Sequence, residues 1–187
     1  MGELYTVTVV KEEVVHKGKY NIFLFYEALH RWFVENKFLD DSGSDNYLET
    51  YYYEDRGSAK EIYFRWRTKK GSDSKYFNYA LNLDAHIVGL REVETVIDGK
   101  KMTLDSGEIT LNIESKMTMD LGDLPSNPLV GFFYKKFLDR WLKPKFEFYK
   151  DELKDKTLGL IGFIKSYFQM PGAKMEPSFT PSRGVGD

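Results

Sequence analysis

The sequence contains three histidines, His16, His30 and His86, which are the side chains best suited to acid–base chemistry near neutral pH. Asp84 lies two positions before His86, on the same face of a predicted strand. A carboxylate in that place could orient the imidazole for general-base catalysis. Such a pair is far more often a solvated contact, and the spacing of the other histidines suggests no second member of a site. We therefore predict no catalytic residue.

The acidic run from Asp40 to Asn46 could bind calcium. Asp41, Gly43 and Asp45 alternate as calcium ligands do, but the run lacks the register and the terminal bidentate glutamate of a calcium loop. The sequence has no cysteine, which excludes thiolate zinc sites, iron–sulfur clusters and cysteine nucleophiles. It also has no glycine-rich phosphate loop and no nucleophile elbow. We predict no metal and no cofactor.

Basic and aromatic side chains share one face of a predicted strand: Tyr63, Arg65, Arg67 and Lys69, which Tyr51 and Tyr53 on the neighbouring strand could extend. Such a surface could stack the bases of a single-stranded nucleic acid and neutralise its phosphates. The net charge of −2 gives no general attraction to nucleic acid, and Tyr–Arg packing across a solvated face explains the same residues. Nucleic acid is therefore not the expected partner.

The segment from Thr157 to Met170 is apolar on more sides than a helix on a sheet requires. Its main apolar stripe does not account for Leu158, Gly159, Gly162, Phe163 and Tyr167. A glycine in a helix interior costs about 1 kcal/mol, so close packing or a bend is expected at each one. The segment is either buried on two sides by its own domain or a docking surface for a subunit, a partner or a membrane. We name these five residues as interface candidates.

The elements that would position these residues begin with a strand over Leu4–His16, which Gly18 is expected to end. From Asn21 the apolar period changes to that of a helix, which runs to about Lys37. The first residues alternate like a strand and have no basic region before them, so we expect no signal peptide. No apolar stretch reaches the roughly 20 residues of a spanning helix. We expect a cytoplasmic protein, or one peripheral at a membrane.

The stretch from Tyr47 to Leu121 alternates with period two between turn-type clusters, as a run of antiparallel hairpins does. Gly89 is expected to bend or bulge one long strand, and Asp98-Gly99 is a hairpin signal. The last strand, Glu108–Leu121, alternates so cleanly that one face must meet the core and the other water. Helices are therefore predicted on one side of the sheet only.

Two helices are predicted after the sheet. Asn127-Pro128 is a strong helix start, and Pro144 should kink or break that helix before a second apolar stripe that ends near Phe168. The fold class is thus α+β, with a single antiparallel meander sheet of about six strands covered on one face by an N-terminal helix and long C-terminal helices. Residues 1–170 form this single domain, and residues 171–187 an extended tail.

The composition is that of a globular protein, with 42% hydrophobic and 30% charged residues. Aromatic residues reach 16%, so the core should be built on rings. The sequence has a single glutamine and many lysines and glutamates, a bias found in proteins of hot environments. An AT-rich genome would also enrich lysine and the aromatic residues, so both origins stay open.

The order of Leu4–His16, Asn21–Lys37, the strands of Tyr47–Leu121 and the helix of Pro144–Phe168 resembles that of the START or Bet v 1-like helix-grip proteins. The resemblance concerns order alone. The chain also departs from it, with one helix where that family usually has two short ones, and an extra helix before Pro144. It implies an apolar cavity between sheet and helix, lined by Phe77, Tyr79, Leu83, Ile109, Leu111, Ile113, Met117, Leu160 and Phe168. The alternative is that these nine side chains fill a solid core.

These features favour a non-enzymatic binding module, with a hydrophobic small molecule or a protein as its partner. A structural protein that self-assembles into a homo-oligomer through its C-terminal helices and tail is the alternative, and an enzyme ranks third. An enclosed void would favour ligand binding, whereas exposed apolar side chains on the last helix would favour assembly.

Overall fold

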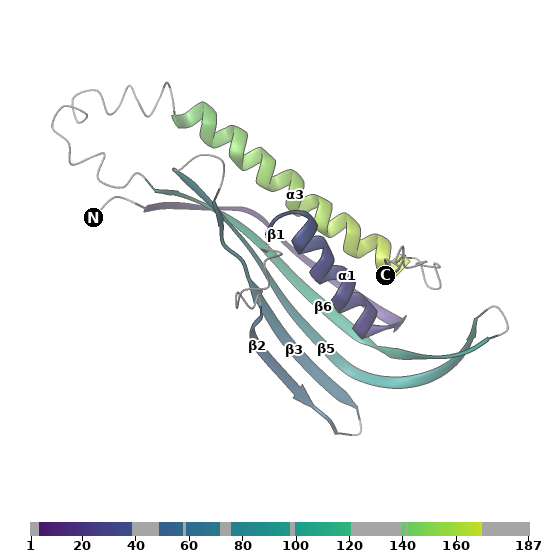
Figure 1. The fold of residues 1–187 in the computed structure, drawn as a ribbon. Coiled ribbons are helices and arrows are strands. Elements are labelled where there is room, and N and C mark those ends of the chain that lie inside the picture. Colours follow the sequence, from purple (N-terminus) through teal and green to yellow (C-terminus); the bar gives the residue numbers. More distant parts are fainter. Residues whose placement is uncertain are drawn as a thin grey trace, which may run out of the picture.

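The computed structural model describes residues 4–38, 49–57, 59–71, 76–97, 100–120, 140 and 142–169. Its antiparallel sheet carries helices on one face (Figure 1). Five strands follow in the order β1 (Leu4–Tyr20), β6 (Lys100–Asp120), β5 (Phe77–Ile97), β3 (Lys60–Arg67) and β2 (Glu49–Asp55), and the two-residue β4 (Lys70–Gly71) pairs with β5. The predicted α+β class and one-sided sheet are therefore confirmed. Several predictions fall outside the described residues: the acidic loop, the Asp98-Gly99 turn, most of the helix from Asn127 and the tail.

The strands are fewer and longer than predicted. Gly89 has a φ of 68°, and the pairing of β5 with β6 shifts register between Val88 and Arg91, so the predicted bulge is present. It bends β5 without ending it, as expected, whereas β6 begins at Lys100 and not at Glu108, so that both strands have 21 residues. The hairpin of β5 and β6 extends beyond the end of β1 and curves (Figure 1).

The first strand departs from the prediction at two points. It does not end at Gly18, because pairing with β6 continues through Gly18–Gly107 to Tyr20–Asp105. A second register shift, between Thr8 and Val10, was not predicted. A bulge inserts one residue and so reverses the alternation of faces beyond it. Before the bulge, the side chains at odd positions of β1 point to the helices. After the bulge, the side chains at even positions do so.

The helix α1 (Ile22–Glu35) confirms the predicted N-terminal helix. The Asn21 side chain accepts a hydrogen bond from the Leu24 amide at 2.9 Å, and Asp105 Oδ2 accepts one from the Ile22 amide at 3.0 Å. These two acceptors satisfy amides that a helix start leaves unpaired, and the second ties α1 to β6. The apolar face of the helix buries Phe25, Leu29 and Phe33.

The helix α3 (Lys143–Gln169) crosses the sheet beside β1 and β6, with α1 alongside (Figure 1). Pro144 lies in its first turn, where a missing amide costs nothing. Whether it kinks or breaks the helix predicted before it stays a prediction, because most of that helix lies outside the described residues. The predicted stripe is buried, with Leu153, Leu160 and Ile164 fully so. In the described part of the chain, neither helix is long and apolar enough to cross a membrane.

The two sides of the sheet differ as strand alternation requires. Phe64 and Trp66 are 1% and 0% exposed, whereas Arg65 between them is exposed and Arg67 is half-buried. Rings from α1 meet this wall, since Phe33 packs edge-on against Trp66 with ring centroids 5.4 Å apart. This arrangement of sheet and C-terminal helix is compatible with a helix-grip fold. The face opposite the helices, called here the outer face, carries the polar side chains.

Candidate ligand pocket at the bend of the sheet

Glycines from three adjacent strands meet where the sheet bends. Gly18 of β1 pairs with Gly107 of β6, and Gly89 of β5 lies in the bulge opposite Gly107. A Cβ atom at Gly107 would lie 3.1 Å from the Val88 carbonyl oxygen and 3.2 Å from Leu90 Cα. Contacts that short with backbone atoms leave no room for a side chain. Gly107 therefore permits the close approach of β5 and β6, and Gly89, with its φ of 68°, permits the bulge.

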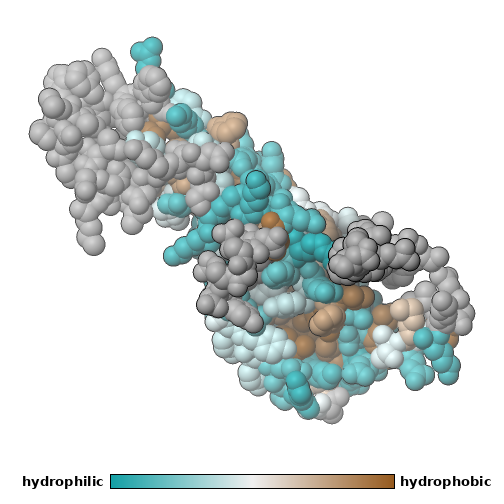
Figure 2. Space-filling view, in the orientation of Figure 1, coloured by the Kyte–Doolittle hydropathy of each residue, from teal (hydrophilic) through white to brown (hydrophobic). Residues whose placement is uncertain are grey.

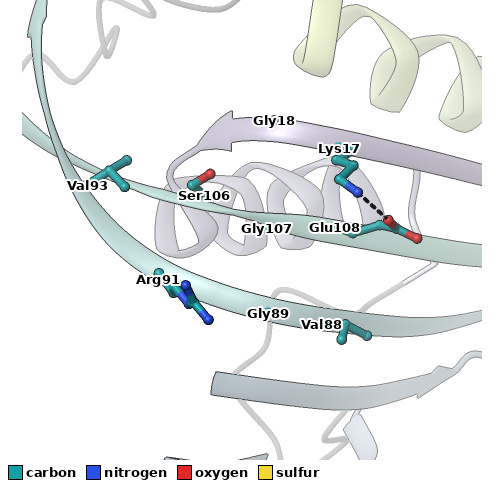
Figure 3. Close-up of a pocket in the computed structure, with 9 residues that line it drawn as sticks. All are labelled: Lys17, Gly18, Val88, Gly89, Arg91, Val93, Ser106, Gly107 and Glu108. Atoms are coloured by element: carbon teal, nitrogen blue, oxygen red, sulfur yellow. Dashed lines mark ion pairs between the residues drawn. The ribbon is translucent and has the colours of Figure 1, made fainter. Parts of the chain in front are cut away.

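An open pocket of about 680 Å³ lies at this bend (Figure 3). It is lined by Lys17, Gly18, Val88, Gly89, Arg91, Val93, Ser106, Gly107 and Glu108. Ile109 is fully buried beneath the helices, so its neighbour Glu108 projects from the outer face. Lys17, which is paired with Glu108, projects from the same face. Arg91 pairs with Ser106 and belongs to the same face. The pocket therefore opens away from α1 and α3.

Positive charge exceeds negative charge around this pocket. Lys17 Nζ lies 3.7 Å from Glu108 Oε2 (Figure 3), and Lys19 Nζ donates to Thr95 Oγ1 at 3.1 Å. Arg91 has no carboxylate at ion-pair distance among the residues that the structure describes. The lining thus contains two cations, Lys17 and Arg91, and one carboxylate, and Lys19 is paired with the lining residue Ser106. The guanidinium of Arg91 is left with its donors available, and its planar fork matches a carboxylate or a phosphate.

The remaining wall of the pocket is apolar. Val88 is 45% exposed, and Val93 is half-buried on the curved part of the hairpin. None of the lining residues is a histidine or a tyrosine, and Glu108 is paired with Lys17. Across the described ranges, no cluster of three potential metal ligands occurs. The pocket can bind an anion attached to an apolar body.

The residues predicted to line a buried cavity lie elsewhere. The nine side chains from Phe77 to Phe168 are all buried in one cluster between the sheet and α3. None of them contributes to the pocket at the bend. A ligand space among them stays a prediction, and the packed cluster agrees with the solid-core alternative.

The interface candidates on α3 divide into two groups. Leu158 is 46% exposed, and an added Cβ at Gly159 or Gly162 would meet no atom within 4 Å. No described residue therefore packs closely against these glycines. Phe163 and Tyr167 are half-buried, and the Tyr167 ring lies 5.1 Å from the Phe25 ring of α1. Tyr167 thus helps to join the two helices and Phe163 packs against the core, so only the first group faces outward.

The predicted Tyr–Arg surface is assembled as the alternation indicated. Tyr51 pairs with Arg65 and Tyr53 with Tyr63 on the outer face, and the Arg65 guanidinium lies 5.5 Å from the Tyr51 ring centroid. Tyr63 stacks on His86, with ring centroids 3.8 Å apart and planes at 14°. Neighbouring groups thus cover ring faces that stacked bases would need. This geometry favours the solvated-face interpretation.

The histidines do not form the pair that the spacing suggested. His86 Nε2 lies 2.9 Å from Glu61 Oε1, whereas Asp84 pairs with Arg67 at 2.5 Å. The hydrogen bond from His86 lowers the pKa of Glu61, since it favours the carboxylate. The direct partners of His86 and Asp84 on β3 are Tyr63 and Arg65, so Glu61 and Arg67 lie diagonally across, within reach of these side chains. The expected Asp84–His86 contact was therefore wrong.

Sequence reasoning missed the pocket at the bend. Gly18 and Gly89 were noticed as interruptions of two strands, but they are far apart in the sequence and only the pairing with β6 brings them together. Three glycines in strands that otherwise alternate cleanly were the available signal. Comparisons with known protein families and with curated proteins found no match to this sequence.

Proposed function

We propose that this protein is a non-enzymatic binding module for an amphiphilic small molecule with an apolar body and an anionic head group. The pocket at the bend of the sheet is its binding site. The observation that carries the proposal is Arg91, a guanidinium without a carboxylate partner among the described residues, in an open pocket with apolar walls. Its volume of about 680 Å³ suits a small ligand.

The head group is assigned to the cationic side of the pocket. Arg91 would bind a carboxylate or a phosphate with two parallel hydrogen bonds, and Ser106 on the paired position could donate a third. Lys17 and Lys19 add positive charge, while Glu108 disfavours a second anion near Lys17. Val88 and Val93 would cover the apolar body. This division of roles predicts selectivity for anionic over neutral amphiphiles.

The test compares octanoate and octyl phosphate with octanol and octylamine, by calorimetry and by shifts of backbone amide resonances. We expect the two anions to bind and to shift the amides of Gly18, Gly89 and Gly107. Replacement of Arg91 by Gln should weaken binding about tenfold or more, since a charged hydrogen bond is lost. Arg65→Gln, on the same outer face but distant from the pocket, is the matched control. Equal binding of octanol and octanoate would reject the proposal.

A second candidate function is association with a protein partner or with another copy of the chain through the helix-bearing side. Leu158 and the two glycines of α3 support it, because nothing in the described chain covers them. Apolar surface also gathers near the start of α1, which carries the exposed Phe23 and Leu24 (Figure 2). A membrane surface would use the same side chains. The helix-grip likeness would instead put an apolar ligand inside the cluster beneath α3.

A further inference from the structure

A second, smaller pocket of about 260 Å³ lies on the outer face and shares no residue with the pocket at the bend. It is lined by Lys11, Arg67, Asn82, Asp84, Asn112, Ile113 and Glu114. These residues come from four adjacent strands, β1, β6, β5 and β3. The surface is therefore the polar centre of the sheet.

Strand register arranges the polar side chains in rows across the sheet. One row runs Arg67, Asn82, Glu114 and Lys11, because each residue is paired with the next. The adjacent row runs Arg65, Asp84, Asn112 and Glu13. Each row contains a guanidinium, a side-chain amide and a carboxylate. Hydrogen-bond donors and acceptors thus alternate over a nearly continuous area.

The charges within this pocket balance. Lys11 and Arg67 offset Asp84 and Glu114, and Arg67 is paired with Asp84 at 2.5 Å. Glu114 is paired with Lys116 at 2.8 Å. A surface without net charge selects neither anions nor cations, in contrast to the pocket at the bend. What it offers is dense hydrogen bonding by Asn82 and Asn112, whose amides both donate and accept.

Aromatic rings border the two rows. The next row on the sheet begins with Tyr63 and His86, whose rings are stacked, and Tyr53 lies beside Tyr63 with ring centroids 6.3 Å apart. Tyr53 is 46% exposed, so its ring is in contact with solvent. Ring edges and half-exposed faces of this kind can pack against the C–H groups of an aliphatic ring. They are less suited to nucleobases, which need free ring faces.

We infer that the outer face at Arg67, Asn82, Asp84, Asn112 and Glu114 binds a neutral, polyhydroxylated ligand of the saccharide class. Carboxylates accept hydrogen bonds from hydroxyl groups, and the guanidinium and amides donate to them. A hydroxyl-rich ligand can hydrogen-bond to both kinds of group, whereas an apolar ligand would displace water from them without replacing its hydrogen bonds. This inference does not depend on the proposed function of the other pocket.

The experiment titrates the full chain with neutral hexasaccharides, namely cellohexaose, maltohexaose, xylohexaose and mannohexaose, and follows amide resonances and heats of binding. We expect at least one to bind with shifts at positions 82, 84, 112 and 114, and an affinity insensitive to salt. Asn82→Ala and Asn112→Ala should each weaken binding about tenfold. Asn78→Ala is the matched control, because Asn78 is exposed on the same face of β5 but outside the pocket.

The opposing outcomes are distinct. If none of the four saccharides binds, or if both asparagine variants bind as the unaltered chain does, the inference is rejected. Binding of an oligothymidylate instead, with an affinity that falls as salt rises, would assign the surface to single-stranded nucleic acid and also reject it. The two asparagine variants should leave octanoate binding unchanged, so failure here is separable from failure of the proposed function.

Discussion

The Cβ position of Gly107 lies 3.1 Å from the carbonyl oxygen of Val88, on the neighbouring strand. Because the opposing atoms belong to the backbone, a methyl group can be accommodated only if β5 moves away from β6. We expect Gly107→Ala to lower the free energy of unfolding by about 1–3 kcal/mol. Urea denaturation followed by circular dichroism measures the change. An unaltered unfolding midpoint would mean that the two strands are not held this closely.

Gly159→Ala should have the opposite effect. An added Cβ there meets nothing within 4 Å, and the residue lies in the interior of α3. Alanine is the better helix former, so we expect the free energy of unfolding to rise by about 1 kcal/mol. The same urea experiment provides the measurement. A destabilised variant would show that something contacts this glycine after all.

The stability of the fold should decrease in mild acid because of His16. Its ring stacks on Phe168 with centroids 4.5 Å apart, and burial lowers the pKa of His16 from its ordinary value of 6.5. The unfolded chain then binds the proton more readily, so stability is lost as the pH falls through 6.5 toward the lowered pKa. Replacement of His16 by Gln should flatten this part of the stability profile. His30→Gln, the same substitution at an exposed position, is the matched control.

Association through α3 is tested best at Leu158. Leu158→Asp places a carboxylate on an exposed part of the helix, so the isolated chain should stay folded. If α3 docks onto another copy or a partner, the charge should dissociate the assembly, since an unpaired carboxylate is costly at a desolvated contact. Light scattering together with circular dichroism separates the two effects.

Phe163→Asp is the contrasting variant. Phe163 is half-buried against the core, and we expect the change to destabilise the chain by several kcal/mol. A Leu158→Asp chain that unfolds would contradict the exposed placement of Leu158. One that keeps its mass and its partners would reject the association surface.

The strands with strict alternation were predicted well. The alternation puts Phe77, Tyr79, Leu81, Leu83, Ala85 and Ile87 on one face of β5, and all are buried. Local pattern suffices here because burial of one face permits a single register. The first strand was predicted less well, since Val9 and Val10 are both apolar and both pack on the core. A period-two pattern does not reveal a bulge at two consecutive β-branched residues, because both are apolar.

The sequence by itself determined the one-sided antiparallel sheet, the helix capped by Asn21 and the buried stripe of α3, because each depends on residues a few positions apart. The tertiary structure alone decided which residues make a site. Gly18, Gly89 and Gly107 meet only through the pairing of β1 and β5 with β6, and Glu61 replaces Asp84 beside His86 only because β3 lies next to β5. Contacts between distant strands depend on register and strand order, which hydrophobic periodicity does not encode.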